Sequence, residues 1–272
     1  MLGEQLTACD ITPAGLKGDR AFALVDQEDG KVASAKSPRK WGALLEFRAR
    51  FLEDATVEIA FPDGSTVRSD DPLVDEVLSA AAGRPVRLAS AAPEAAVFEE
   101  VWPAIDGLAP EEIIAGTNIG TDEAGERISQ FPLAGAAPAG TFFDLAVLHL
   151  MTGATLAQLA RLNPSGTFDV RRYRPNLILD VDDASGFIEN EWVGRILATV
   201  GGVRIRVSLP TMRCVMTTLA QADLPEDRST LRTIADHNRV EIPGLGVWAC
   251  AGAYAEVVEA GTLEVGAELS LV

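Results

Sequence analysis

The sequence predicts a mainly β protein with a few helices, of the α+β class. Short segments that are rich in β-branched residues, or that alternate between apolar and polar residues, recur along the chain, and glycine and proline separate them. Helical patterns are fewer and shorter. At 272 residues the chain exceeds the usual size of one domain. We therefore expect a β-barrel with helical decoration, preceded by a smaller N-terminal β-rich domain.

The first domain is predicted over residues 1–90 and contains two hairpins and a helix. The hairpins are expected at 21–35 and 56–68, because each range holds two apolar-rich segments on either side of an Asp-Gly turn. A short helix should follow between Pro72, which suits the first helical turn, and Gly83, which suits a left-handed cap.

Residues 91–140 are predicted to form an extended acidic connection between the domains. Alanine, proline, glycine and acidic residues dominate this segment, and no periodic pattern is sustained through it. A disordered acidic insert is an equally good interpretation, because a segment of this composition buries little apolar surface.

The second domain is predicted over residues 141–272. It should contain two helices, one at 154–160 that ends before Pro164, and one at 229–237 with Ser229 as its cap. The strands of this domain are expected at 145–148, 176–181, 203–207, 213–218, 255–258 and 268–271.

Charge and cysteine content narrow the class of partner. The formal net charge of −17 argues against nucleic acid and against anionic membranes as partners, because both require a basic surface. Cys9, Cys214 and Cys250 form no CxxC pair, which fits neither a disulfide framework nor a zinc ribbon and favours a reducing compartment. The first residues lack a leader pattern, and the most apolar stretch, 133–160, is interrupted by proline and charged residues. A soluble cytoplasmic protein is predicted.

One region offers the local basic pocket that an anionic ligand would need. Residues 161–213 hold eight arginines against six acids in an otherwise acidic chain. Within it, Pro175 fixes the start of an apolar strand, and Arg174 and Asn176 should share one face. A guanidinium and a carboxamide there suit a phosphate or the polar edge of a heterocycle. Ordinary surface ion pairs are the better interpretation for the arginines at 171–172, and an equally good one for Arg174.

Cys214 follows Arg213 at the junction of a loop with a predicted strand. A neighbouring guanidinium favours the thiolate, the form that binds metals, and soft sulfur suits a transition metal. A buried structural cysteine is the commoner role of a lone thiol, and the residues by themselves favour that alternative. Cys250 lies among small residues and suits packing. His149 and His237 are too few for a histidine-based metal site and are expected in the core or at helix ends.

Several short motifs occur in the order that is typical of one family. Gly18-Asp19-Arg20 stands before a strand, Arg174-Pro175-Asn176 opens another, Arg213-Cys214 precedes Thr217-Thr218, and a glycine-bounded segment at 261–266 closes the chain. Together they resemble the MOSC family, in the branch with an N-terminal MOSC-associated β domain that includes the mitochondrial amidoxime-reducing component. The resemblance covers nearly the whole chain, is strongest from 141 to 272, and places the family's usual first strand upstream of the first residue.

The resemblance implies that the ligand is a molybdenum cofactor, a molybdopterin. It implies that Cys214 binds the metal and is the catalytic residue. The residues that it places around the cofactor are Arg20, Thr152, Arg174, Asn176 and Arg213. A phosphate at the N-terminus of the helix that follows Thr152 would also be favourable, because backbone N–H groups and the helix dipole attract anions there.

The implied activity is that of an oxidoreductase that reduces small N-hydroxylated or related N–O substrates. Three scattered cysteines cannot ligate an iron–sulfur cluster, and no flavin or nicotinamide motif is visible, so the electrons should come from a separate reductase. The alternative is a non-catalytic carrier of the cofactor or of sulfur, with a persulfide on Cys214 in place of the metal.

Overall fold

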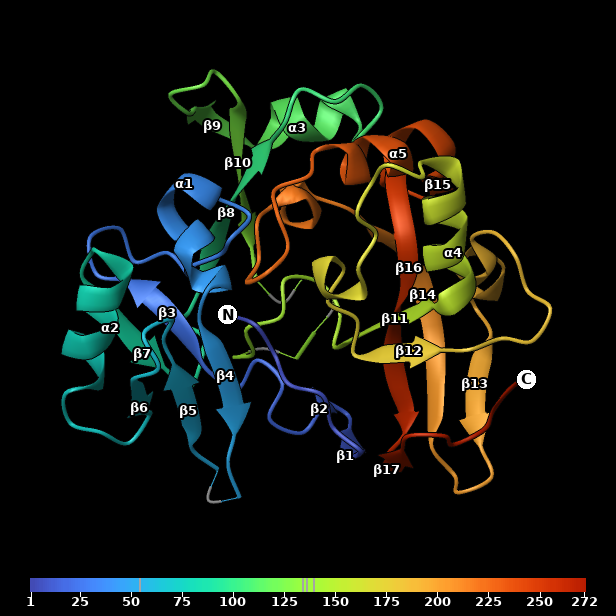
Figure 1. The fold of residues 1–272 in the computed structure, drawn as a ribbon, viewed down its shortest axis with the longest axis horizontal. Helices are drawn as coiled ribbons and strands as arrows, with labels where there is room; N and C mark the ends of the chain where they lie inside the picture. Colours follow the sequence, from blue (N-terminus) through green and yellow to red (C-terminus); the bar gives the residue numbers. More distant parts are fainter. Residues whose placement is uncertain (54, 134, 136, 139) are drawn as a thin grey trace.

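The computed structural model describes residues 1–53, 55–133, 135, 137–138 and 140–272. A large sheet occupies the C-terminal half of the chain, and several small sheets build the N-terminal half, with short helices on their faces (Figure 1). This arrangement confirms the predicted α+β class. Within the described residues, no helix is both long enough and apolar enough to cross a membrane.

The large sheet has seven strands in the order β12-β11-β16-β14-β13-β18, with β15 paired to one end of β16. β12 runs parallel to β11, and the other pairs are antiparallel. Three register shifts interrupt the β14–β16 ladder, and such bulges increase strand twist, so the sheet curls into a half-barrel. The strands are β11 Leu148–Thr152, β12 Leu177–Leu179, β13 Ile196–Thr199, β14 Arg204–Met212, β15 Arg239–Ile242, β16 Gly246–Glu259 and β18 Leu269–Leu271.

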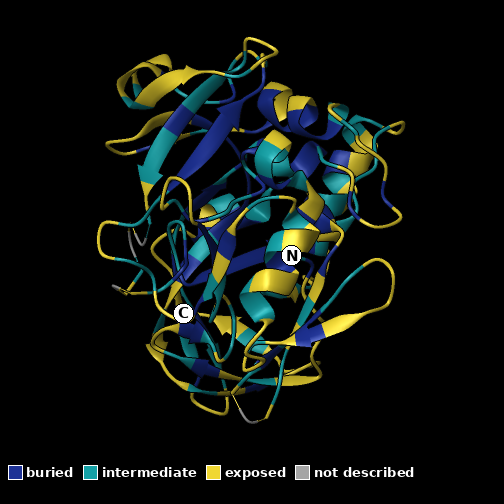
Figure 2. Cartoon of the chain, turned by 90° about the vertical axis from the view of Figure 1, so that its left-hand side faces the viewer, coloured by how far each residue is buried: buried dark blue, intermediate teal, exposed yellow. Residues whose placement is uncertain are grey.

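Two apolar clusters cover the two faces of this sheet. Successive side chains of a strand point to opposite faces, so Leu150 packs in one cluster and Met151 in the other. The helices α4 (Gly153–Leu162) and α5 (Ser229–His237) pack on the face of Met151, through residues such as Leu159 and Leu231. Figure 2 shows how buried and exposed segments are distributed over the whole chain.

Both helices lie where the sequence predicts them, but the start of α5 differs in detail. Ser229 is the first helical residue and not the cap. The Asp227 carboxylate accepts hydrogen bonds from the Ser229 backbone N–H and hydroxyl, at 2.9 and 2.6 Å, so the aspartate satisfies this helix end.

The N-terminal half has its own core of residues such as Trp41 and Leu78. The hairpin predicted at 56–68 is confirmed as β5–β6. The one predicted at 21–35 is confirmed in part: around a bridge between Val25 and Val32, the Asp26 N–H donates to the Lys31 carbonyl and the Ala33 N–H to the Leu24 carbonyl, both at 2.9 Å. The longer ladder of β3 is with the more distant β7. The helix that Gly83 ends in a left-handed conformation is confirmed. The elements are β3 Ala23–Asp26, α1 Pro38–Trp41, β4 Arg48–Phe51, β5 Val57–Ala60, β6 Thr66–Arg68, α2 Val74–Ala82 and β7 Val86–Ala89.

The two ends of the chain share a small sheet. β1 (Ala8–Thr12) pairs with β2 (Gly15–Leu16) on one side and with β17 (Gly261–Glu264) on the other (Figure 1). Residues 8–16, which fall in the first predicted domain, are therefore hydrogen-bonded to the end of the second.

The segment at 91–140 is neither an extended connection nor a disordered insert in its described part. Its strands form a sheet in the order β8-β10-β9, beside α3. The acids on β8 are paired by lysines from the N-terminal half: Lys31 and Lys40 contact Glu99. Because these partners lie far away in the sequence, no local sequence pattern predicts that this segment is folded. Positions 134, 136 and 139 lie outside the described residues. The elements are β8 Val97–Trp102, α3 Glu111–Thr117, β9 Asn118–Thr121 and β10 Arg127–Pro132.

The buried side chain of Arg172 forms hydrogen bonds with three separate backbone segments of the second domain. It is 1% exposed, and its guanidinium donates to the backbone carbonyls of Thr167, Leu219 and Pro225 at 2.9, 3.0 and 2.6 Å. The predicted surface ion pair is therefore wrong for Arg172. It is confirmed for Arg171, which is exposed and pairs with two aspartates, Asp169 and Asp223. Arg172 and Arg171 lie in a short 3₁₀ turn, Val170–Arg172, and the other 3₁₀ turns are Gly42–Leu45, Ile188–Trp192 and Val215–Thr218.

The neighbouring arginines provide a matched test of this difference. Arg172→Met should lower the free energy of unfolding by about 3 kcal/mol or more, because it leaves several buried carbonyls without a donor. Arg171→Met removes only exposed ion pairs and should change stability little. Urea unfolding of both variants measures the difference, and equal effects would contradict the buried role of Arg172.

Candidate functional site

Cys214 lies at the end of β14, where the chain leaves the sheet. The residue is half-buried and extended, and it caps the 3₁₀ turn Val215–Thr218. The strand predicted at 213–218 is therefore wrong. The Thr217 hydroxyl donates to the Cys214 carbonyl at 3.1 Å, and the Thr218 hydroxyl donates to the Val215 carbonyl at 2.7 Å. Such local bonds compete with a strand ladder and fix the turn that presents the thiol.

Lys36 is a cation whose charge acts on this thiol, and no local sequence pattern marks it. Its ammonium group lies 2.9 Å from the Asp144 carboxylate and 3.0 Å from the Glu100 carboxylate, above the ring of Phe98. Although burial opposes the charged form, these carboxylates and the nearby Cys214 raise the pKa of Lys36 well above its ordinary value. Lys36 is therefore a fixed positive charge beside Cys214.

The prediction that the Cys214 thiolate is favoured in the free protein is wrong. Burial raises the pKa of the Cys214 thiol to about 11, and the charge of Glu100 acts in the same direction. Lys36 and Arg213 oppose this shift without reversing it. The free thiol is protonated at neutral pH, so a metal that binds it must displace the proton.

Arg213 turns away from the cleft and into the protein. Its guanidinium donates to the Ala251 carbonyl at 2.7 and 2.8 Å and to the Tyr173 carbonyl at 3.2 Å, and it also contacts the ring of His149. These contacts with β16 fix the backbone immediately before Cys214. The structure thus places Arg213 as a support of the cysteine and not at the surface of the cleft.

Arg20 and Arg174, from opposite halves of the chain, meet at the same cleft. Arg20 donates to Asp144 at 3.0 Å, and Arg174 donates to the Met1 carbonyl at 2.8 Å. Burial and the charge of Arg20 lower the pKa of Arg174. Two guanidinium groups that repel each other in a recess favour a bound anion, which would relieve the repulsion. We call these two residues the arginine pair.

Asn176 supports the site through contacts with both halves. Its side-chain oxygen accepts from the His149 backbone N–H at 2.9 Å, and its amide nitrogen donates to Asp19 at 2.8 Å. Asn176, which was predicted to share a face with Arg174 and bind a ligand, thus forms its hydrogen bonds with other residues of the protein. Asn176 positions the Gly18-Asp19-Arg20 turn against the start of β12.

Thr152 lies apart from this group, at the far end of β11. It is fully buried, and its hydroxyl accepts from the Thr155 N–H at 3.1 Å as the cap of α4. The anion expected at this helix N-terminus is the protein's own Glu189, whose carboxylate accepts from the Thr152 N–H at 2.6 Å and from the Thr155 hydroxyl at 2.5 Å. Glu189 therefore occupies the position at which a phosphate was predicted.

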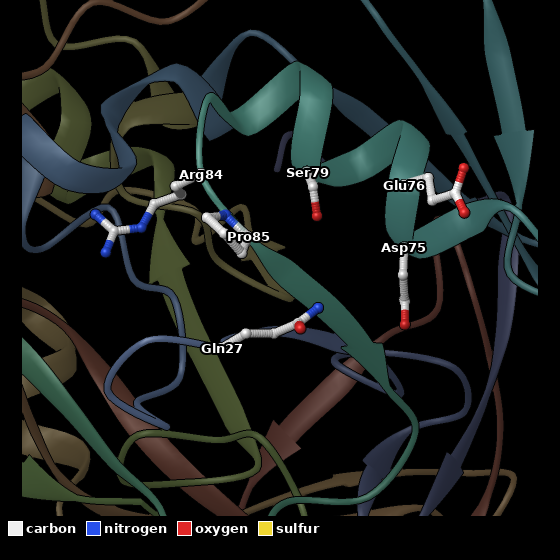
Figure 3. A pocket seen from close by; sticks show the side chains of 6 residues that line it. All are labelled: Gln27, Asp75, Glu76, Ser79, Arg84 and Pro85. Carbon is white, nitrogen blue, oxygen red and sulfur yellow. The ribbon is translucent and has the colours of Figure 1, made fainter.

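A large cleft lies between the two halves, and it connects the arginine pair with Asn176 and Lys36. It is lined by residues from both sides, among them Arg20, Lys36, Asp144, Arg174, Asn176 and Met216. A second hollow lies under α2, where Asp75 and Ser79 point toward Gln27 (Figure 3). Its polar groups are used internally: Ser79 and Gln27 donate to the Val86 carbonyl, and Asp75 accepts from the Leu88 N–H. The cleft is the better candidate site.

Comparison with known proteins identifies the second half of the chain. Residues 140–270 match the family model described as the MOSC domain. The second half of the chain is a MOSC domain. The family is associated with binding of the molybdenum cofactor. A search of curated proteins gave no match.

Two solved structures resemble the chain at low identity. YiiM from Geobacillus stearothermophilus is 19% identical over 47% of this chain and 54% of its own length, with a TM-score of 0.32. The YuaD protein from Bacillus subtilis is 10% identical over 64% of this chain and 84% of its own length, with a TM-score of 0.37. The match thus spans only about half of YiiM.

The residues around this cleft, which come from the MOSC domain and from the N-terminal half, fit a molybdenum cofactor. A single half-buried thiol supplies one soft ligand and leaves other coordination positions open, and Lys36 and the arginine pair supply positive charge for anionic groups. Among the described residues, no group of three or more His, Cys, Asp or Glu side chains is placed to hold a metal ion by itself. This donor set suits a metal that brings its own ligands.

The contact of His149 with Arg213 should make the stability of the fold depend on pH. It is buried, and its Nε2 atom must accept from Arg213, which can only donate. Burial first, and then the charge of Arg213, lower the pKa of His149 well below 6.5. The neutral imidazole thus stabilises the folded state above pH 6.5, and this contribution is lost as the pH falls toward the folded-state pKa.

We expect the free energy of unfolding to fall between pH 7 and pH 5, with a His149 component that approaches about 1.4 kcal/mol per pH unit. His149→Gln keeps an acceptor for Arg213 but cannot take up a proton, so it should remove this component. Urea unfolding of both proteins across this range measures it. An identical pH dependence in the variant would show that His149 is not buried in its neutral form.

Proposed function

We propose that the chain binds a molybdenum cofactor through Cys214 and acts as an oxidoreductase toward small N-hydroxylated or related N–O substrates. The observation that carries the proposal is that Lys36 and the arginine pair line one cleft, and that the charge of Lys36 acts on the Cys214 thiol. When bound, the cofactor would supply a metal that accepts an oxygen atom and passes electrons to the N–O bond.

Each residue of the candidate site has a specific role in this proposal. Cys214 binds the metal after it loses its proton, and Lys36 offsets the negative charge that results. The arginine pair binds the phosphate of the cofactor through charge-assisted hydrogen bonds. Arg213 and Asn176 are positioning residues, because they hold the cysteine turn and the Gly18-Asp19-Arg20 turn.

The electrons would come from a separate reductase. Cys9 lies in β1 and Cys250 is fully buried in the core opposite Met212, and the three thiols form no metal-holding group among the described residues. The acidic surface that follows from the net charge of −17 would favour a donor protein with a basic docking face.

Metal content tests this proposal. Protein from a host that makes the cofactor should hold about one molybdenum per chain, and Cys214→Ser should lose it, because a serine hydroxyl is a much poorer ligand for a soft metal. Elemental analysis measures the ratio. Cys9→Ser is the matched control, since Cys9 is likewise a half-buried thiol and lines the cleft, and it should keep the metal.

Two results would contradict the proposal. One is retention of molybdenum by Cys214→Ser. The other is cyanolysable sulfur on Cys214 without molybdenum, which would support the alternative of a sulfur carrier with a persulfide at this position.

A further inference from the structure

Both members of the arginine pair have an unusual backbone conformation. Arg20 and Arg174 have φ angles of 49° and 55°, in the left-handed region that residues with a side chain seldom adopt. The fold holds them there: a Cβ atom at Gly18 would lie 2.6 Å from the ring of Phe51, and Pro175 fixes the chain after Arg174. Strain of this kind is retained where the surrounding structure needs a particular placement.

Asp19 lies beside both arginines. It precedes Arg20 in the chain, lines the cleft, and accepts a hydrogen bond from Asn176 at 2.8 Å. In the described part of the chain, Asn176 is the side chain with which its carboxylate pairs directly. Its negative charge nevertheless contributes to the raised pKa of Arg20 and opposes the lowering of the pKa of Arg174, so it acts on the arginines at longer range. No other part of the proposed mechanism uses this charge.

We propose that Asp19 is an internal counter-ion that determines the specificity of the arginine pair. A small free anion such as inorganic phosphate is attracted by the two arginines and repelled by Asp19, so it is held weakly. A phosphate monoester whose organic part makes further contacts along the cleft overcomes the same repulsion. This is specificity by a repulsive element built into the site. The inference rests on the proposed role of the arginine pair as a phosphate site.

Inorganic phosphate is the probe that tests this role. Calorimetric titration of the cofactor-free protein should show that Asp19→Asn binds phosphate about tenfold more tightly than the unaltered chain, the effect expected of one unit charge at short range in a partly screened site. The asparagine keeps an acceptor for Asn176, so the variant removes the charge and retains the hydrogen bond. The gain should shrink as salt is added, because ions screen the charge.

Two further variants separate a local effect from a general one. Asp10→Asn makes the same change of charge at an exposed residue of the cleft that pairs with Lys17, and it should leave phosphate affinity unchanged. The double variant Asp19→Asn with Arg174→Gln should lose the gain, because one of the two attracting charges is gone. Thermal unfolding checks that each variant is folded.

The possible outcomes decide the question either way. Equal or weaker binding by Asp19→Asn, an equal gain in Asp10→Asn, or no phosphate binding by any of the proteins would overturn the inference. Because the titration needs no molybdenum, its failure is distinct from failure of the proposed function: a chain that loads molybdenum but shows no gain rejects the role of Asp19 alone.

Discussion

The carboxylate of Asp144 is the contact on which the candidate site depends. One oxygen accepts from Arg20 and the other contacts Lys36, and both cations come from the N-terminal half. These two cations lower the pKa of Asp144 far below its ordinary value, so it stays ionised. The bridge brings the Gly18-Asp19-Arg20 turn and Lys36 to the edge of the MOSC domain. Without it, Arg20 and Lys36 would lose the carboxylate that they share at this edge.

Burial and charge compete throughout this cleft, and the balance differs from one residue to the next. Carboxylates overcome the cost of burial at Lys36, which stays charged. At Cys214 burial prevails over two nearby cations, and the free thiol keeps its proton. In the proposed function, a metal that binds Cys214 must therefore displace the thiol proton.

The local sequence was a good guide where function and structure depend on neighbouring residues. Cys214 and Arg174 were predicted as site residues because a turn or a proline marks their place beside a strand. Lys36 was missed because its partners, Glu100 and Asp144, lie far along the chain. Thr152 was placed at a phosphate site because a helix N-terminus attracts an anion, and nothing local showed that Glu189 already occupies it.

The sequence by itself determined the α+β class, the two main helices of the second domain and the ordered motifs around Cys214. These follow from periodicity, caps and turns, which act over a few residues. Only the tertiary structure decided that β1 joins the end of the chain and which arginines face the cleft. It alone also decided that the thiol is protonated. Strand pairing, burial and the electrostatic environment of a residue depend on contacts between segments that are distant in the sequence. Local sequence patterns do not show which of these segments come into contact.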